Sequence, residues 1–314
     1  MKLRDFAYYR TGGRCQAFYE PRSLEELAKI VTALTATQQK YFVLGGGSNS
    51  LVIDEDWPGA VIVFTRMKRI EVSGNEIVCE AGADNSDVVR KALEAELFGL
   101  SWMYRLPGQI GGTVRMNARC YGGEISQVVK RVDTVLPDGT IRSFTPSEGI
   151  FRAYKDTLFM SNQAIIAQVV IGLEKGDPKI IRQQMDFCEQ DRIRKGQFTY
   201  PSCGCVFKND YGVGVPSGML LDHASVHRLS HDRVQINPKH ANFVFNKGAS
   251  SRDILEITLR MRELVYQEFG VWLEYEMEVL GQLPHDLQIK MKETRPAQWN
   301  EVKLEELRQD FRKK

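Results

Sequence analysis

The spacing of apolar residues along the chain predicts several amphipathic helices. Ser23-Leu-Glu-Glu26 has the form of a helix capping box, and the apolar residues that follow it recur at helical spacing. Further helices are expected over residues 84–97 and from Asp177-Pro178 onward, where aspartate can cap a helix and proline suits its first position. The last long helix should begin at Ser250 and stop at Gly270.

Short apolar runs bounded by turn residues predict strands between these helices. Two of them flank a glycine-rich loop, and two hairpins turn at Gly74-Asn75 and at Pro137-Asp-Gly139. The other expected strands and hairpins cover residues 59–63, 70–80, 132–144, 164–173, 205–207, 241–245 and 271–280. This succession of strands with interspersed helices predicts an α+β fold.

Composition and charge narrow the class of protein. The chain has 314 residues, of which 43% are hydrophobic and 26% charged, which is ordinary for a globular protein of two or three domains. Its net charge of +2 argues against a dedicated nucleic-acid partner. No apolar run approaches the length of a membrane span, and Met1-Lys-Leu-Arg-Asp5 lacks the apolar region of a signal peptide. We therefore expect a cytoplasmic protein without a membrane partner.

The six cysteines do not form a metal-binding pattern. Only Cys203 and Cys205 are close in sequence, and a C-x-C pair without a second pair or a nearby histidine is a poor zinc signal. Structural disulfides are not expected in the cytosol. We therefore expect no metal site, and most of these thiols should be ordinary buried residues.

The most informative motif is the run Tyr41-Phe-Val-Leu-Gly-Gly-Gly-Ser-Asn-Ser-Leu-Val-Ile-Asp54. Glycines lack Cβ atoms, so backbone N–H groups in such a loop can approach an anion closely, and Ser48 and Asn49 add side-chain donors. The loop is followed by a strand where a dinucleotide fingerprint requires a helix, and Ser50 replaces the last glycine of that fingerprint. The motif therefore predicts a phosphate loop of a non-Rossmann kind. The alternative is a glycine turn within a hairpin.

A second glycine-rich stretch covers residues 106–123. Gly111 and Gly112 are expected near a helix N-terminus, which favours anions. Two glycine-rich loops more than fifty residues apart suggest one ligand with a pyrophosphate, and hence a nucleotide cofactor. The alternative is a pair of independent turns.

Two further segments carry groups that could take part in chemistry. Cys205 lies close to Lys208 and Asn209, and a thiol near positive charge can serve as a proton donor; the alternative is a core cysteine. In the last predicted strand, Glu274, Glu276 and Glu278 alternate with apolar residues, which is also typical of a solvated face.

Six motifs together occur in the order typical of one family. They are Val43-Leu-Gly-Gly-Gly-Ser-Asn-Ser-Leu-Val52, Leu106-Pro-Gly-Gln-Ile-Gly-Gly112, Met116-Asn-Ala118 with Tyr121-Gly-Gly-Glu124, Tyr200-Pro-Ser-Cys-Gly-Cys-Val-Phe-Lys-Asn209, His240-Ala-Asn-Phe243 and Leu273-Glu-Tyr-Glu276. Over about residues 3–281 the chain resembles the UDP-N-acetylenolpyruvoylglucosamine reductase (MurB) family of peptidoglycan synthesis. It resembles the family's shorter subtype, which lacks an inserted subdomain.

The resemblance implies a fold and a cofactor. The fold would be α+β, with a two-subdomain FAD-binding unit of the vanillyl-alcohol-oxidase (PCMH) type and a C-terminal α+β substrate-binding domain. The expected boundaries are 1–65 and 66–175 for the two FAD-binding subdomains, 176–281 for the substrate domain and 282–314 for a polar tail. The residues expected to bind FAD are Gly45, Gly46, Gly47, Ser48, Asn49, Pro107, Gly108, Gly111 and Gly112.

The resemblance also implies a reaction and the residues that perform it. In the family, NADPH reduces the flavin, which passes a hydride to the enolpyruvyl group of a UDP-sugar; an acid then protonates the neighbouring carbon to give UDP-N-acetylmuramate. By position the acid would be Cys205, aided by Glu276 and Lys155. The residues expected to bind the UDP-sugar are Tyr154, Lys195, Lys208 and Asn209.

The chain departs from the family pattern at several of these positions. Cys205 stands where the family usually has serine, and Lys155 where it has arginine, whose fork a lysine cannot reproduce on a carboxylate. Arg115 and Arg119 replace residues that are normally small or apolar. A catalytically drifted FAD protein and a related flavin oxidase for another sugar therefore stay as alternatives.

A monomer is the expected state.

Overall fold

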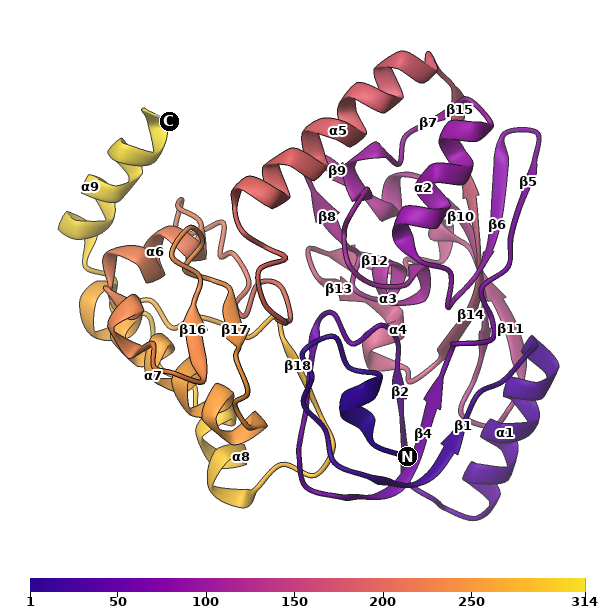
Figure 1. Ribbon diagram of the computed structural model, residues 1–314, viewed down its shortest axis with the longest axis horizontal. Helices are drawn as coiled ribbons and strands as arrows, with labels where there is room; N and C mark the ends of the chain where they lie inside the picture. The colour runs from indigo at the N-terminus through magenta and orange to yellow at the C-terminus, as the bar shows by residue number, and fades with distance from the viewer. Residues whose placement is uncertain (314) are drawn as a thin grey trace. The chain divides into compact units, whose positions relative to one another are not determined.

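The computed structural model describes residues 1–313, so Lys314 at the end of the expected polar tail lies outside the described residues. The chain divides into two compact units, each of which is treated by itself (Figure 1). Unit 1 contains Met1, Cys15–Gly46 and Pro58–Ile193. Unit 2 contains Lys2–Arg14, Gly47–Trp57 and the chain from Arg194 onward. Within residues 1–313, no helix is long and apolar enough to cross a membrane.

Unit 1 is built on a five-stranded antiparallel sheet with the strand order β11-β10-β14-β6-β5. Both predicted hairpins lie in this sheet and are confirmed. The strands are β5 (Ile70–Ser73), β6 (Glu76–Glu80), β10 (Val129–Val135), β11 (Ile141–Phe144) and β14 (Ile165–Gly172). The central strand β14 is almost entirely buried, because it has a neighbour on each side and helices α1 and α3 pack against it.

A second, three-stranded sheet in unit 1 has the order β1-β4-β2. Its strands are β1 (Cys15–Tyr19), β2 (Tyr41–Leu44) and β4 (Trp57–Val63), and β2 pairs with β4 in parallel. Three two-stranded pairs complete the unit: β7 (Leu97–Phe98) with β15 (Glu174–Lys175), β8 (Arg119–Cys120) with β9 (Gly123–Glu124), and β12 (Phe151–Ala153) with β13 (Asp156–Thr157).

The helices of unit 1 begin where their capping residues predict. In α1 (Leu24–Ala36) the Ser23 side chain accepts a hydrogen bond from the Glu26 backbone N–H, and Asp84 caps α2 (Asn85–Glu94) in the same way. The others are α3 (Ile110–Arg115), α4 (Leu158–Ser161) and α5 (Pro178–Arg194), with single 3₁₀ turns at Ser101–Met103, Ile125–Gln127 and Pro146–Glu148. One continuous apolar core joins these helices to the sheets.

In unit 2, as far as its residues are described, helices are longer than strands, and the strands form two short pairs. One is antiparallel, between β16 (Val234–Ile236) and β17 (Val244–Asn246); the other is parallel, between β3 (Ser50–Val52) and β18 (Glu278–Leu280). Its helices are α6 (Ser217–His223), α7 (Ser251–Phe269), α8 (His285–Lys292) and α9 (Glu301–Arg312), with 3₁₀ turns at Leu3–Asp5 and Val226–Leu229. The capping box of Ser250 and the left-handed Gly270 bound α7 as predicted.

Three strands predicted in unit 2 are wrong in extent. The strand expected over residues 241–245 is found as Val244–Asn246. Residues 205–207 form only single β-bridges, Cys205 with Phe243 and Phe207 with Tyr275. Of the strand expected over residues 271–280, only Glu278–Leu280 forms a ladder, because its partner β3 is three residues long. The predicted α+β fold is confirmed, whereas the domain boundaries at 65, 175 and 281 stay a prediction.

Candidate active site

The first glycine loop is not a hairpin turn. The strand before it, β2, pairs with β4 in unit 1, whereas the strand after it, β3, pairs with β18 in unit 2. The hairpin alternative is therefore wrong, and the strand–loop–strand prediction is confirmed. Because Gly46 ends one segment of unit 1 and Gly47 begins one of unit 2, the loop contributes residues to both units.

The two glycine-rich loops are neighbours within unit 1. A Cβ atom on Gly46 would lie 3.2 Å from the Cα of Gly108, and one on Gly45 would lie 3.5 Å from Oε1 of Gln109. The two loops are therefore not independent turns, and side chains larger than hydrogen would separate them. This adjacency is what a single ligand shared by both loops requires.

Backbone hydrogen bonds hold the second loop in place. The Gly108 carbonyl accepts from the Asn85 N–H at 3.1 Å, and the Gly111 N–H donates to the Ala81 carbonyl at 2.9 Å. Gly111 has no room for a side chain, because its Cβ would lie 2.8 Å from that of Ala81. Gly112 faces open space, with no atom within 4 Å of its Cβ position. Both glycines lie in the first turn of α3, as predicted.

The residues of this cradle fit the FAD that the sequence predicts. Gln109 Oε1 is buried without a hydrogen-bond partner, which costs free energy unless a donor reaches it. It lies beside Gly45, so an N–H or O–H of a bound cofactor could satisfy it. Gln109 was missed by the sequence analysis, since a glutamine between glycines carries no signal of its own.

The remainder of the first loop lies in unit 2, next to Glu276. Gly47 has a φ of +64°, and its Cβ would lie 2.7 Å from the Cα of Ala7, so only glycine suits this position. Asn49 donates from Nδ2 to the Glu276 carbonyl at 3.0 Å, and its own carbonyl accepts from the Glu278 N–H at 3.0 Å. The loop is therefore bonded to the backbone of the residue that carries the predicted carboxylate.

Cys205 and Glu276 are brought together by the backbone around Val206. The Glu276 N–H donates to the Val206 carbonyl at 2.8 Å, and the Val206 N–H donates to the Asn242 carbonyl at 2.9 Å. The buried Asn242 side chain then accepts from the Phe207 N–H at 2.9 Å and donates to the Phe207 carbonyl at 2.8 Å. Asn242 therefore fixes the position of the segment that carries the thiol.

The neighbouring thiol of Cys203 is chemically different from Cys205. Cys203 is 1% exposed, and burial raises the pKa of its thiol, which the nearby Cys205 and Glu276 raise further. Cys205 is only half-buried, and Gly204, with a φ of +76°, makes the turn between the two. Cys203 is therefore a core residue, while Cys205 is the more accessible thiol.

The predicted substrate-binding residues of unit 2 occupy the surface around this segment. Lys208 Nζ lies 3.4 Å from Glu274 Oε2, so the first glutamate of the alternating series lies on a solvated face. Asn209 Oδ1 accepts from the Ser217 N–H at 2.9 Å. Lys195 contributes its carbonyl to a hydrogen bond from Asn237 at 2.8 Å.

Unit 1 contains the remaining predicted residues in a strained turn between β12 and β13. Lys155 is 9% exposed and has a φ of +54°, which is uncommon for a residue with a side chain. Its Nζ lies 5.8 Å from the centroid of the Tyr154 ring, and the Arg119 guanidinium lies 5.0 Å from the same centroid. Arg119 also pairs with Glu124 at 3.6 Å. Two cations therefore converge on Tyr154.

The predicted site residues are divided between the units. Those in unit 1 are Gly45, Gly46, Pro107, Gly108, Gly111, Gly112, Tyr154 and Lys155. Those in unit 2 are Gly47, Ser48, Asn49, Lys195, Cys205, Lys208, Asn209 and Glu276.

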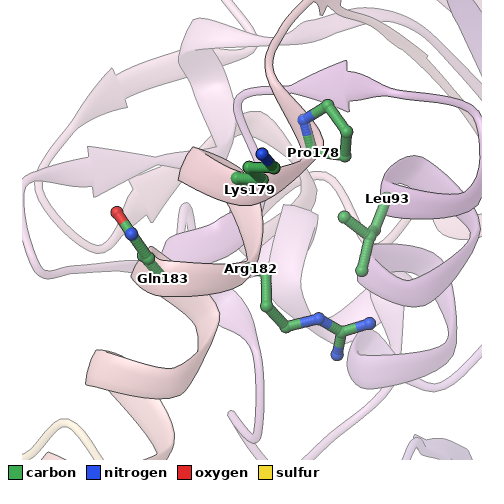
Figure 2. A pocket seen from close by; sticks show the side chains of 5 residues that line it. All are labelled: Leu93, Pro178, Lys179, Arg182 and Gln183. Atoms are coloured by element: carbon green, nitrogen blue, oxygen red, sulfur yellow. The ribbon is translucent and has the colours of Figure 1, made fainter.

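Unit 1 also has a surface pocket that none of the predicted site residues lines. It is lined by Leu93 of α2 and by residues of the first turns of α5, namely Pro178, Lys179, Arg182 and Gln183 (Figure 2). None of its lining residues was predicted to take part in binding or catalysis.

Comparison with known proteins identifies both regions. Residues 15–145 match the family model of an FAD binding domain, and residues 196–280 match that of the UDP-N-acetylenolpyruvoylglucosamine reductase C-terminal domain. The chain is 34% identical over 281 residues to the UDP-N-acetylenolpyruvoylglucosamine reductase of Enterococcus faecalis, covering 89% of this chain and 93% of the relative. For that of Carboxydothermus hydrogenoformans the identity is 33%, with 89% and 92% covered.

A solved structure agrees with these matches. The crystal structure of UDP-N-acetylenolpyruvylglucosamine reductase (MurB) from Thermus caldophilus aligns with a TM-score of 0.74 and 32% identity, covering 89% of this chain and 97% of that one. The glycine cradle and the two matched regions define an FAD-dependent oxidoreductase with a separate C-terminal domain. More particularly, the chain belongs to the UDP-N-acetylenolpyruvoylglucosamine reductase family, in which NADPH is the reductant.

Proposed function

We propose that this chain reduces UDP-N-acetylenolpyruvoylglucosamine to UDP-N-acetylmuramate, with electrons from NADPH, for peptidoglycan precursor synthesis. The observation that carries the proposal is the direct bond from Asn49, in the first glycine loop, to the backbone of Glu276. A cofactor-binding loop and an acid–base pair are thereby adjacent. The shared family and the names of the relatives support the same reaction.

The glycine loops would hold FAD. Gly45, Gly46 and Gly108 leave room for a phosphate near backbone donors, and Gln109 offers an acceptor to the cofactor. Ser48 and Asn49 add side chains in unit 2. When bound, FAD supplies the hydride that it has received from NADPH.

Cys205 would supply the proton. Reduction of the enolpyruvyl double bond adds a hydride to one carbon and a proton to the other, so a proton donor must stand beside the second carbon. Cys205 is half-buried, the residue after it accepts a hydrogen bond from the Glu276 N–H, and a thiol is a competent proton donor. Glu276 would orient the substrate and assist in returning a proton to the thiolate.

Lys155 would stabilise the charge that develops on the substrate carboxylate. A fixed ammonium group in a buried setting serves this purpose, because it needs no reorganisation as the charge builds. Tyr154 would position Lys155 through the cation–π contact between its ring and the ammonium group. Lys195, Lys208 and Asn209 would bind the UDP-sugar.

We further propose that the enzyme acts as a cytoplasmic monomer. Its substrate and reductant are both soluble nucleotides, and no nucleic-acid or membrane partner is needed. Light scattering during gel filtration tests the oligomeric state, for which a mass near 35.8 kDa is expected. Cell fractionation tests the compartment.

An anaerobic visible spectrum of the purified protein tests the reaction. NADPH should bleach the flavin absorbance, and addition of UDP-N-acetylenolpyruvoylglucosamine should restore it. Bleaching without recovery would point to another acceptor, as expected for a drifted relative. Protein that neither carries FAD nor takes it up would end the proposal.

A further inference from the structure

The residues after Gly281 form an integral part of unit 2. The matched C-terminal family model ends at residue 280, yet helices α8 and α9 follow it. Leu287 and Leu304 are fully buried and Leu307 is 4% exposed, all within the core of the unit. The polar tail expected from the sequence is therefore a docked extension.

The extension docks against the end of α7. The Gln298 N–H donates to the Gly270 carbonyl at 3.1 Å, and the Asn300 N–H donates to the Phe269 carbonyl at 2.9 Å. A Cβ on Gly270 would overlap Gln298, with 1.7 Å to its carbonyl oxygen. Lys303 on α9 also pairs with Glu268 on α7. These contacts set the position from which α9 begins.

Arg308 on α9 reaches a loop that lies next to predicted substrate-binding residues. Its Nε donates to the Val213 carbonyl at 2.9 Å, while its Nη1 pairs with Glu301 at 2.8 Å. The Arg308 side chain is 18% exposed, and a Cβ on Gly214 would lie 3.3 Å from Nε. The guanidinium is therefore held in one geometry on the loop.

The segment of residues 208–217, the 208–217 loop, is closed at its base. Asn209 Oδ1 accepts from the Ser217 N–H at 2.9 Å, and the Ser217 hydroxyl donates to the Lys208 carbonyl. Val213 is buried in the core near the middle of the loop. Arg308 thus fixes the middle of a loop whose base carries Lys208 and Asn209.

We propose that Arg308 is a positioning residue for substrate binding: through Val213 it orders the 208–217 loop, which presents Lys208 and Asn209 to the UDP-sugar. Ordering the loop before the substrate arrives lowers the entropy cost of binding. The inference rests on the proposed function, since it takes the UDP-sugar as the ligand of this loop.

Steady-state kinetics on the FAD-loaded enzyme tests the role. Arg308→Ala should raise KM for UDP-N-acetylenolpyruvoylglucosamine about tenfold, in line with the loss of a charge-assisted hydrogen bond, and change kcat less than about twofold. The rate of flavin reduction by NADPH should stay unchanged. Arg308→Lys keeps the positive charge and can still donate to one acceptor, so it should recover part of the loss. The matched control is Arg312→Ala, since Arg312 lies on the same helix, is 69% exposed and pairs only with Glu305 among the ion pairs of residues 1–313.

Hydrogen exchange supplies a readout that does not depend on activity. Amides of the 208–217 loop should exchange faster in Arg308→Ala, while those of α7 stay protected. An unchanged KM, a raised KM without faster loop exchange, or equal effects in Arg312→Ala would each overturn the proposal. If the wild-type enzyme binds FAD and is reduced by NADPH but ignores the UDP-sugar, the proposed function fails instead, whatever the loop amides show.

Discussion

The two regions of the candidate site differ in how closely their backbones approach: glycine contacts define the first, and buried side-chain amides support the second. In unit 1, Gly108 and Gly111 of the second glycine loop are held by backbone hydrogen bonds with Asn85 and Ala81, and the Asn85 side chain also donates to the Leu106 carbonyl at 3.2 Å. In unit 2, the backbone bonds around Val206 are joined by side-chain amides: Asn242 binds both backbone groups of Phe207, and Asn49 binds the Glu276 carbonyl.

This difference predicts how each region responds to substitution. A region defined by backbone contacts tolerates changes of side chain but not an added Cβ atom where the chains approach. A region defined by side-chain amides depends on those amides, because loss of one leaves buried backbone groups unpaired. The glycine region should therefore fail by steric exclusion of the cofactor, and the thiol region by loss of alignment.

The largest effect is expected for Gly46→Val. A Cβ at this position lies 3.2 Å from the Cα of Gly108, so the backbone of the second loop would have to shift, and valine adds two further methyl groups. We expect loss of bound FAD and a fall in activity of at least about a hundredfold, since catalysis needs the cofactor. The ratio of flavin to protein absorbance measures it, with circular dichroism to verify folding. A yellow, fully loaded variant would contradict the backbone-cradle interpretation.

The next effect concerns only one half-reaction. Cys205→Ala should slow reoxidation of the reduced flavin by the UDP-sugar about a hundredfold or more, because the proton donor is lost. Flavin reduction by NADPH should stay intact, which stopped-flow absorbance can follow separately. Cys205→Ser keeps a donor and serves as the control. An equal loss in both half-reactions would exclude the proton-donor role.

A smaller effect on the rate of flavin reoxidation should distinguish Glu276 from Glu278. Glu276→Gln is expected to slow the same half-reaction by about tenfold, since the Glu276 backbone bonds to Val206, which follows Cys205, and the carboxylate is replaced by a neutral amide. Glu278→Gln should change it less than about twofold, because Glu278 belongs to the β3–β18 pair and meets Asn49 through its backbone. The reverse order in single-turnover rates would reassign the carboxylate.

The remaining effects are on stability and cofactor affinity, and they compare the side-chain amides of Asn242 and Gln109. Asn242→Ala should lower the free energy of unfolding by about 2–4 kcal/mol, because both polar groups of Phe207 lose their partner. Gln109→Ala should change the unfolding of the apoprotein by less than about 0.5 kcal/mol, since Oε1 has no partner there. It should instead weaken FAD binding about fivefold. Urea unfolding and flavin titration measure the two effects, and equal stability losses would remove the contrast.

Local signals allowed the helices of the fold to be predicted, but not the extent of the strands in unit 2. The helix α7 follows from the capping box at Ser250 and the stop at Gly270, which act through neighbouring residues. The strand expected over residues 271–280 shows the right alternation of burial, yet it pairs only over Glu278–Leu280. Its partner is distant in the sequence, and no local pattern indicates how long that partner is.

For the candidate site, the sequence predicted the adjacency of the two glycine loops, where glycine constrains the backbone. The adjacency of Gly46 and Gly108 follows the interpretation of two loops around one ligand. Gln109 and Arg308 were not predicted from the sequence. The burial of Gln109 Oε1 and the bond from Arg308 to the Val213 carbonyl depend on the tertiary structure, and no local sequence pattern indicates them. The roles of Cys205, Glu276 and Lys155 stay predictions for the experiments above.

The pairing of β3 with β18 has a consequence for how the chain is made. Asn49 and the carbonyl of Glu276 that it binds are 227 residues apart in sequence, and the buried Leu51 pairs with Val279 of β18. During synthesis on the ribosome, strand β3, which follows the loop from Gly47 to Asn49, therefore cannot pair until β18 near residue 280 has been synthesised. We expect unit 2 to complete its folding only after release, and nascent chains shorter than about residue 280 to leave an apolar strand exposed for chaperones to bind.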